Sequence, residues 1–186
     1  GLGDVYKRQI QRSEFDWETI QEKIAKNPLI KNKNAKPRIM TITQSTYDGI
    51  VYNDEVIKEK LDGKVDILHF DEAWLPHAAF SPFYSDMHAI DRNKPRTKKS
   101  MVFATHSTHK LLAGISQASQ ICIQDSETEK LDRSSFNEAF MMHTSTSPQY
   151  AIIASCDVAA AMMEGRAGKA LVEESIAEAV YFRRAM

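Results

Sequence analysis

Short apolar runs alternate with amphipathic stretches along this chain. Four apolar runs predict strands over residues 38–43, 65–70, 101–104 and 121–124. Apolar positions at helical spacing predict helices over residues 15–26, 53–61, 111–119, 135–142, 157–164 and 171–184. Residues 150–154 could form a further strand, but the alanines there leave the assignment open. This alternation is typical of an α/β fold, in which helices cover both faces of a mostly parallel sheet.

Helix-breaking residues separate these elements. The first helix ends before Asn27 and Pro28, because the residue that precedes a proline avoids helical geometry. The helix over 53–61 ends at Asp62 and Gly63. Residues 75–99 contain three prolines and predict a long loop region. A loop of that length in a compact domain is usually functional or mobile.

Composition indicates a globular protein and excludes several classes. At 186 residues the chain is one domain or part of one, with 42% hydrophobic and 26% charged residues. The net charge of −1 gives no reason to expect nucleic acid or an anionic membrane as a partner, and the basic stretch 92–99 is typical of a solvated loop. No membrane-spanning apolar run and no signal peptide is visible. Cys122 and Cys156 form neither a disulfide framework nor a zinc pattern, so we expect no metal, buried free thiols and a cytoplasmic location.

Lys110 is the first candidate for chemistry. It follows an apolar strand through a loop of threonine, histidine and serine, and an apolar stretch comes next. A lysine with a packed stem can aim its amine at one point, as a Schiff-base lysine must. Ser107 and His109 flank it with donors suited to a phosphate. Taken alone, Lys110 is more typical of a solvated loop lysine than of a Schiff-base lysine.

Asp71 strengthens the functional interpretation, because it follows a second apolar strand. Ligands in open α/β sheets bind beyond the carboxyl ends of the strands, so Asp71 and Lys110 can meet the same ligand. Pyridoxal phosphate requires such a pair. The lysine binds the aldehyde, and an acid opposite the pyridine nitrogen keeps it protonated, so that the ring acts as an electron sink.

Several separated blocks carry a resemblance to a known family. The chain resembles the large domain of the bacterial biodegradative arginine/lysine/ornithine decarboxylases, a fold-type I pyridoxal-phosphate family, from about Phe15 to the last residue. The joint order and spacing of these blocks make the resemblance specific. The blocks are PRIMT (37–41), STYDG (45–49), FDEAW (70–74), STHKLL (107–112), SQAS (116–119), FNEA (136–139), MMHT (141–144) and TSP (146–148).

The resemblance implies roles for the matching residues. Lys110 would hold the cofactor covalently, and Asp71 would pair with its pyridine nitrogen. Ala73 would lie against the ring face with Trp74 close by, while Ser107 and His109 would bind the phosphate. Ser145 would reach the phosphate bound to the partner subunit, although the family usually has threonine there.

The resemblance also implies that this chain is incomplete. The histidine that stacks on the ring lies upstream of the matched segment in the family, and the C-terminal domain lies downstream. Residues 10–186 would thus be an incomplete cofactor-binding large domain. Residues 1–9 are interpreted as a non-native tail, because Asp4 to Gln9 spell the translation of a sequencing-library adapter.

The expected activity is decarboxylation of a basic amino acid by a pyridoxal-phosphate enzyme that works as a homodimer or larger homo-oligomer. Arginine, which would yield agmatine and carbon dioxide, is the first choice, because residues 103–107 and 177–180 resemble the arginine branch; lysine and ornithine remain open. An alternative of another class is a non-catalytic binding or regulatory protein. Another reaction on the same fold also stays open. The segment alone is expected to be inactive.

Overall fold

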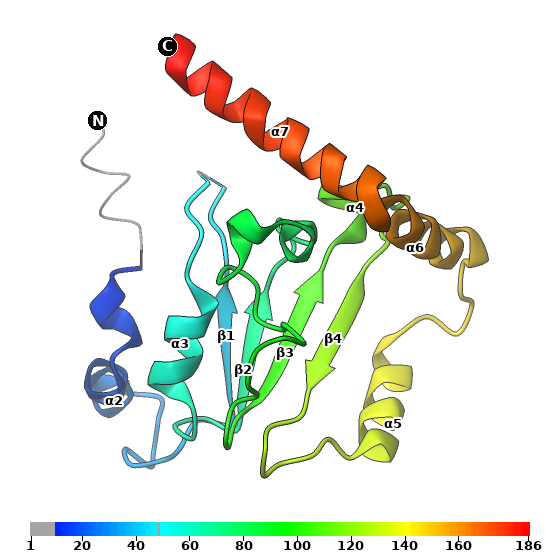
Figure 1. Cartoon of the computed structure of the whole chain (residues 1–186). Helices are drawn as coiled ribbons and strands as arrows, with labels where there is room; N and C mark the ends of the chain where they lie inside the picture. Colours follow the sequence, from blue (N-terminus) through cyan, green and yellow to red (C-terminus); the bar gives the residue numbers. More distant parts are fainter. Residues whose placement is uncertain (1–9, 48) are drawn as a thin grey trace.

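A four-stranded sheet forms the centre of the computed structural model, which describes residues 10–47 and 49–186. The strands lie in the order β1 (Ile39–Thr43), β2 (Ile67–Asp71), β3 (Met101–His106) and β4 (Gln120–Gln124). The first three are parallel, and β4 pairs antiparallel with β3. In Figure 1 the arrowheads of β1, β2 and β3 point to one edge of the sheet. We call this the carboxyl edge.

Helices surround this sheet. At the carboxyl edge lie α4 (Thr108–Leu111), α6 (Tyr150–Met163) and the long α7 (Gly165–Ala185), as Figure 1 shows. The remaining helical elements are η1 (Arg12–Phe15), α2 (Trp17–Lys26), α3 (Asp54–Leu61), η2 (Ala78–Phe80), η3 (Pro82–Tyr84) and α5 (Arg133–His143). The sheet with its flanking helices confirms the predicted α/β class.

The hydrophobic core lies on one face of the sheet, called here the core face. Leu68 and Phe70 of β2 and Val102 of β3 point to it and are fully buried. On α3, Ile57 and Leu61 pack against them. Burying side chains of this size stabilises the fold by about 1.5–3 kcal/mol each, so α3 is held firmly on the sheet.

The opposite face of the sheet, called here the open face, is less covered. α5 lies against it beside β3, where the rings of Phe103 and Phe136 meet edge to face with centroids 6.2 Å apart. Towards β1 the face is accessible, and Ile39 is 52% exposed. The two faces therefore differ in how completely the described residues cover them.

Two predicted elements were wrong. No helix spans 111–119: α4 ends at Leu111, and residues 112–119 form a loop that contains Gly114 and a left-handed residue, Gln117, with φ of 76°. Residues 150–154 are the first turns of α6 and not a strand, because no helix breaker separates them from the apolar positions that follow. The predicted tail, residues 1–9, falls outside the described residues.

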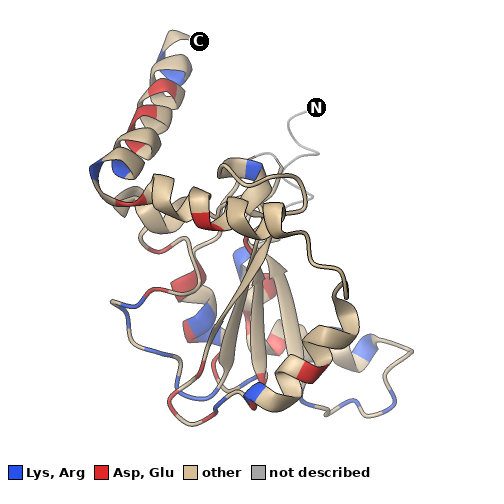
Figure 2. Cartoon of the chain, turned by 90° about the vertical axis from the view of Figure 1, so that its right-hand side faces the viewer, with Lys and Arg blue, Asp and Glu red and all other residues tan. Residues whose placement is uncertain are grey.

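Charged residues lie mostly on loops and helices around the sheet, while the strands are uncharged along most of their length (Figure 2). Acidic and basic residues are mixed along α7. None of the described helices is both long and apolar enough to cross a membrane.

Candidate active site

Asp71 is the last residue of β2, at the carboxyl edge. It stands in register with Thr43 of β1 and Thr105 of β3, so three polar side chains from neighbouring strands share this edge. The backbone N–H of Ala73 donates to Asp71 Oδ1 at 3.1 Å and fixes the turn after the strand. This leaves the other carboxylate oxygen without a hydrogen-bond partner among the described residues.

Lys110 lies one strand away, in the short helix that follows β3. Its backbone N–H donates to the carbonyl of Ser107 at 3.1 Å. The loop after α4 folds back on the helix, and the N–H of Gly114 donates to the carbonyl of Thr108 at 3.2 Å. A Cβ at Gly114 would lie only 3.0 Å from that carbonyl, so the close approach favours glycine.

The Lys110 amine lies over an aromatic ring. Its Nζ atom is 4.7 Å from the centroid of the Trp74 indole. Trp74 follows Asp71 by three residues, so the segment that carries the acid also carries the ring under the lysine. A cation in this position is attracted by the ring face. Asp71 and Lys110 are thus linked through residues 71–74. The Lys110 amine forms no ion pair within the described part of the chain.

Tyr47 extends this arrangement and had no role in the sequence interpretation. Its ring meets Trp74 edge to face, with centroids 5.3 Å apart. Tyr47 comes from the turn after β1, and it is 88% exposed. Its place after a strand end was the available signal, because three parallel strands deliver their following loops to one edge.

Ser107 and His109 flank the lysine in space as well. Ser107 is the N-cap residue of α4, yet its side chain makes no capping hydrogen bond, which leaves the hydroxyl for a ligand. His109 Nδ1 lies 2.8 Å from the carbonyl oxygen of Ala118. Since a carbonyl only accepts, Nδ1 carries a proton, and Nε2 can donate to a phosphate only when the ring is fully protonated.

Ser145 is not brought to Lys110. It is exposed in the segment between α5 and α6, which Figure 1 shows on the far side of β4. Its hydroxyl accepts from the backbone N–H of Ser147 at 3.1 Å. Its predicted role toward a second subunit stays a prediction.

Polar side chains from three neighbouring strands lie near Asp71 on the open face. His69 Nδ1 is 3.2 Å from Thr41 Oγ1, and His69 Nε2 is 3.1 Å from Thr105 Oγ1. The threonines hold the imidazole between two strands. Nothing in the sequence spacing of His69 points to this bridge.

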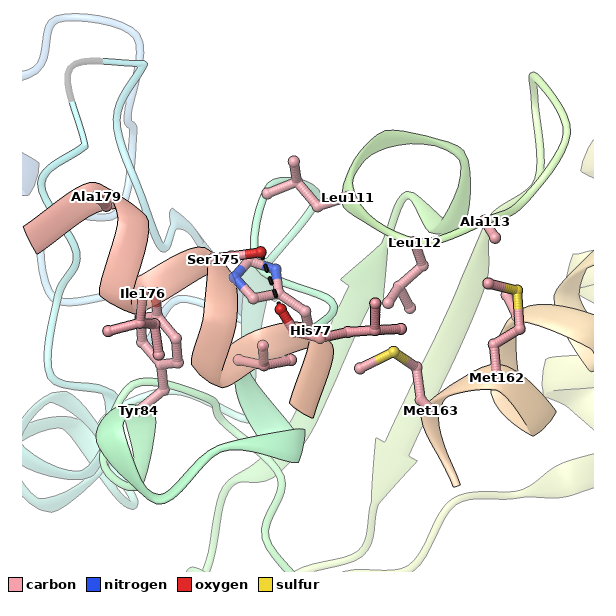
Figure 3. A pocket seen from close by; sticks show the side chains of 13 residues that line it. His77, Tyr84, Leu111, Leu112, Ala113, Met162, Met163, Ser175, Ile176 and Ala179 are labelled. Carbon is pink, nitrogen blue, oxygen red and sulfur yellow. Dashed lines mark hydrogen bonds between the residues drawn. The ribbon is translucent and has the colours of Figure 1, made fainter. Parts of the chain in front are cut away.

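A mostly apolar cavity of about 440 Å³ lies beside α4 (Figure 3). It lies between residues 111–113, the C-terminal end of α6, the middle of α7, and His77 with Tyr84 from the long loop. The imidazole of His77 has no partner for its buried Nδ1 atom, and burial lowers the pKa of that ring. Neither Lys110 nor Asp71 lines this cavity.

Among residues 10–47 and 49–186, no group of His, Cys, Asp or Glu side chains has an arrangement that could hold a metal ion.

The fold and this edge define an α/β domain with a lysine and an aspartate at the carboxyl ends of adjacent parallel strands. Residues 5–186 match the family described as "Orn/Lys/Arg decarboxylase, major domain". The chain belongs to this family.

Relatives with known names agree with the family. The chain is 53% identical over 177 residues to lysine decarboxylase LdcA of Pseudomonas aeruginosa, covering 95% of this chain and 23% of that protein. It is 45% identical over 186 residues to the biodegradative arginine decarboxylase of Escherichia coli K12, covering 100% and 24%. The chain thus spans about a quarter of the length of these relatives.

Solved structures show the same fold. Lysine decarboxylase A from Pseudomonas aeruginosa superposes with a TM-score of 0.85 at 53% identity, over 95% of this chain and 24% of that one. The constitutive lysine decarboxylase of Escherichia coli superposes with a TM-score of 0.82 at 43% identity, over 95% and 23%.

Proposed function

We propose that the protein that contains this chain is a pyridoxal-phosphate-dependent decarboxylase of a basic amino acid. The observation that carries the proposal is that Asp71 ends β2 while Lys110 lies in the helix after the adjacent strand β3, with its amine 4.7 Å from the centroid of the Trp74 ring. Membership of the decarboxylase family supports the same conclusion.

The residues present fit the cofactor. Asp71 keeps one carboxylate oxygen without a partner, and the Lys110 amine is in contact only with an aromatic ring among the interactions of the described residues. The Ser107 hydroxyl is not used to cap its helix. Pyridoxal phosphate would thus be held by Lys110, Asp71, Ala73, Trp74, Ser107 and His109, and Ser145 would serve the site of a second subunit in a homodimer.

Each residue would then have a defined task. When bound, the cofactor supplies an electron sink for the bond that breaks at the α-carbon. Asp71 holds a proton on the pyridine nitrogen, because a carboxylate favours the positive charge there. Lys110 would hold the cofactor, and its amine could supply a proton at the α-carbon. Trp74 limits the movement of the amine.

Lysine is the substrate that we place first. The expectation of arginine rested on two short stretches, and the comparisons do not favour it. Identity is 53% to a lysine decarboxylase and 45% to an arginine decarboxylase, while an ornithine decarboxylase of Escherichia coli K12 reaches 32%. The assay described below distinguishes lysine from arginine and ornithine as the substrate.

A non-catalytic binding role is the second candidate. A protein that only used the fold for binding would not need both the lysine and the acid. Lys110 and Asp71 are both present, at the strand ends where the chemistry requires them, and this favours an enzyme.

The test is turnover by the full-length protein that contains this chain. Lysine, arginine and ornithine are supplied separately, and carbon dioxide and the diamine are measured. We expect decarboxylation of lysine, loss of turnover and of the cofactor absorbance in Lys110→Ala, and retention of both in the control Lys169→Ala, which is exposed on α7. Full activity in Lys110→Ala would contradict the proposal.

A further inference from the structure

A second cavity, of about 670 Å³, lies near β4 and the long loop. This cavity is separate from the site around Lys110. It is lined by Glu72, His106 and Cys122, whose side chains lie on the core face. Asp71 and Glu72 are neighbours in the chain, and they point to opposite faces. The proposed decarboxylation therefore makes no use of the groups in this cavity.

A buried ion pair forms the floor of the cavity. His106 Nε2 lies 2.6 Å from Glu72 Oε2, and the Glu72 side chain is only 2% exposed. The other oxygen of Glu72 accepts from the backbone N–H of Ala89 at 2.5 Å. Glu72 is thus fixed on both sides, and it fixes the orientation of the imidazole.

The imidazole carries a positive charge at neutral pH. Burial acts to lower the pKa of His106, but hydrogen bonds with Cys122 and Glu72 and the charge of Glu72 outweigh it and raise this pKa to about 9. Asp54 is the other titratable group against Glu72. Burial and the Glu72 charge raise the pKa of Asp54 to about 9, so Asp54 is neutral and does not compete for the imidazolium.

Cys122 lies on the other side of the ring. Its Sγ atom is 4.0 Å from His106 Nδ1, and the thiol forms no disulfide. The order carboxylate, imidazole, thiol is the arrangement that activates cysteine nucleophiles, in which the acid orients the base and the base faces the sulfur. A thiolate beside an imidazolium is the nucleophilic form.

Basic residues line the mouth of the cavity. Arg92 and Arg96 come from the long loop and Arg133 from the start of α5. None of the three forms an ion pair within the described part of the chain. The acidic residues that line the same cavity are Glu72, which His106 neutralises, and Asp125, whose carboxylate accepts from the N–H of Leu131 at 3.0 Å. The cavity therefore has an excess of positive charge and favours negatively charged molecules.

We propose that Cys122 is a reactive thiol, oriented by His106 and Glu72, and that it is modified by small anionic disulfides. In the reaction the Cys122 sulfur attacks one sulfur of the disulfide, and a new S–S bond forms as the old one breaks. The other half leaves as a thiolate, which takes up a proton. The disulfide is the oxidant, and the protein gains a mixed disulfide.

The experiment measures labelling rates on the full-length protein that contains this chain. Iodoacetamide, which is neutral, and iodoacetate, which is anionic, are applied separately at neutral pH, and the peptides with Cys122 and Cys156 are quantified by mass spectrometry. Cys156, on α6, is the internal control, because it is half-buried too and has no histidine partner among residues 10–47 and 49–186. Oxidised glutathione is the probe for the disulfide reaction.

We expect Cys122 to react at least about tenfold faster than Cys156 with both reagents. The ratio of the iodoacetate to the iodoacetamide rate should be higher at Cys122. His106→Gln should bring its rate down to that of Cys156. The double variant Arg96→Gln, Arg133→Gln should lower only the iodoacetate rate, and it leaves the core untouched. Oxidised glutathione should form a mixed disulfide at Cys122 that dithiothreitol reverses.

Equal rates at the two cysteines, or labelling of Cys122 only after denaturation, would overturn the proposal. So would an unchanged iodoacetate preference in the double arginine variant. If His106→Gln disturbed the fold, the labelling rate of Cys156 would rise in that variant. The iodoacetate preference of Cys122 in the unmodified protein and in the double arginine variant would then test the proposal.

Discussion

Asp71 and Glu72 illustrate how neighbouring residues acquire different tasks. Asp71 ends β2 on the open face, where one of its oxygens accepts from the N–H of Ala73 and the other has no hydrogen-bond partner among the described residues. Glu72 points to the core face and is tied to His106. The alternation of side chains along a strand separates the two acids, so a substitution at each should affect a different property.

The first prediction concerns Asp71. In the full-length protein, Asp71→Asn should retain the cofactor, since Lys110 still anchors it, but should slow decarboxylation by about a hundredfold or more, because a neutral amide does not hold the charge on the pyridine nitrogen. Steady-state turnover and cofactor absorbance check this. A rate within a few-fold of the parent enzyme would mean that Asp71 does not face the ring.

The second prediction concerns stability at alkaline pH. The pKa of Asp54 rises from 3.8, and that of His106 from 6.5, to about 9 in the folded protein. Both groups bind a proton more tightly when folded. Their stabilising contribution is complete below the unfolded pKa and is lost as pH rises through the folded pKa. Between neutral pH and about pH 9, the free energy of unfolding should fall, by up to about 1.4 kcal/mol per pH unit for each group.

Thermal unfolding of the protein at several pH values measures this loss. Asp54→Asn is the informative variant, because the amide stays neutral at every pH. Its stability should depend less on pH over the alkaline range. A melting temperature that stays constant or rises towards pH 9 would show that these two groups are not buried as described.

At the scale of elements, the sequence predicted the strands well and α4 poorly. The strands are short, mostly apolar runs, and each is followed by a polar or turn-forming stretch, which predicts a strand directly. The stretch 111–119 is also apolar, but its fold depends on the approach of Gly114 to Thr108 and on a left-handed Gln117. These are tertiary constraints, and a periodic pattern does not reveal them.

A single carboxylate joins the end of α3 to the start of β3. The backbone N–H groups of Lys98, Lys99 and Ser100 donate to Asp62 at 2.7 to 2.9 Å. Burial acts to raise the pKa of Asp62, but these hydrogen bonds outweigh it and lower the pKa. The contribution of Asp62 to the stability of the fold is therefore complete above the unfolded pKa of 3.8, and it is lost as pH falls through the pKa of the folded protein.

The third prediction follows from this junction. Asp62→Ala should lower the free energy of unfolding by about 1–3 kcal/mol at neutral pH, because three N–H groups lose a charged acceptor. Asp66→Ala is the matched control: its carboxylate pairs with Lys36 and Arg38 on the surface, and such pairs contribute about 0–1 kcal/mol. Urea unfolding of both variants provides the comparison. Equal losses would contradict the special role of Asp62.

At the scale of the whole molecule, the described residues leave large apolar side chains uncovered. Tyr181 and Phe182 on α7 are 76% and 63% exposed, and Tyr150 on α6 is 78% exposed. Exposed apolar groups of this size mark surfaces that contact other protein. Since the chain spans about a quarter of its relatives, we infer that further parts of the full-length protein, or a second copy, cover them.

The fourth prediction is that the isolated chain of 186 residues binds the dye 8-anilinonaphthalene-1-sulfonate more strongly per residue than the full-length protein does, because its apolar surfaces on α6, α7 and the open face are accessible. Fluorescence titration of both proteins measures this. Equal binding would show that these surfaces remain uncovered in the full-length protein.

The positions of the main site residues could be predicted from the sequence, but the contacts between side chains could not. The positions of Asp71 and Lys110 followed from strand ends, because parallel strands bring those ends to one edge. The contact of Tyr47 with Trp74 and the bridge of His69 between two threonines depend on strand register and rotamers. The same holds for the cysteine cavity on the core face, where Glu72, His106 and Cys122 come from three different segments.

The measurement that tests the central claim most directly is identification of the lysine that holds the cofactor. The full-length protein is incubated with pyridoxal phosphate and reduced with borohydride, which fixes the cofactor covalently to the lysine that holds it, and the modified peptide is sequenced. We predict modification at Lys110 as the main product, with none at the control Lys169. Modification mainly at another lysine, or none above background, would contradict the assignment of Lys110 and with it the proposed decarboxylase chemistry.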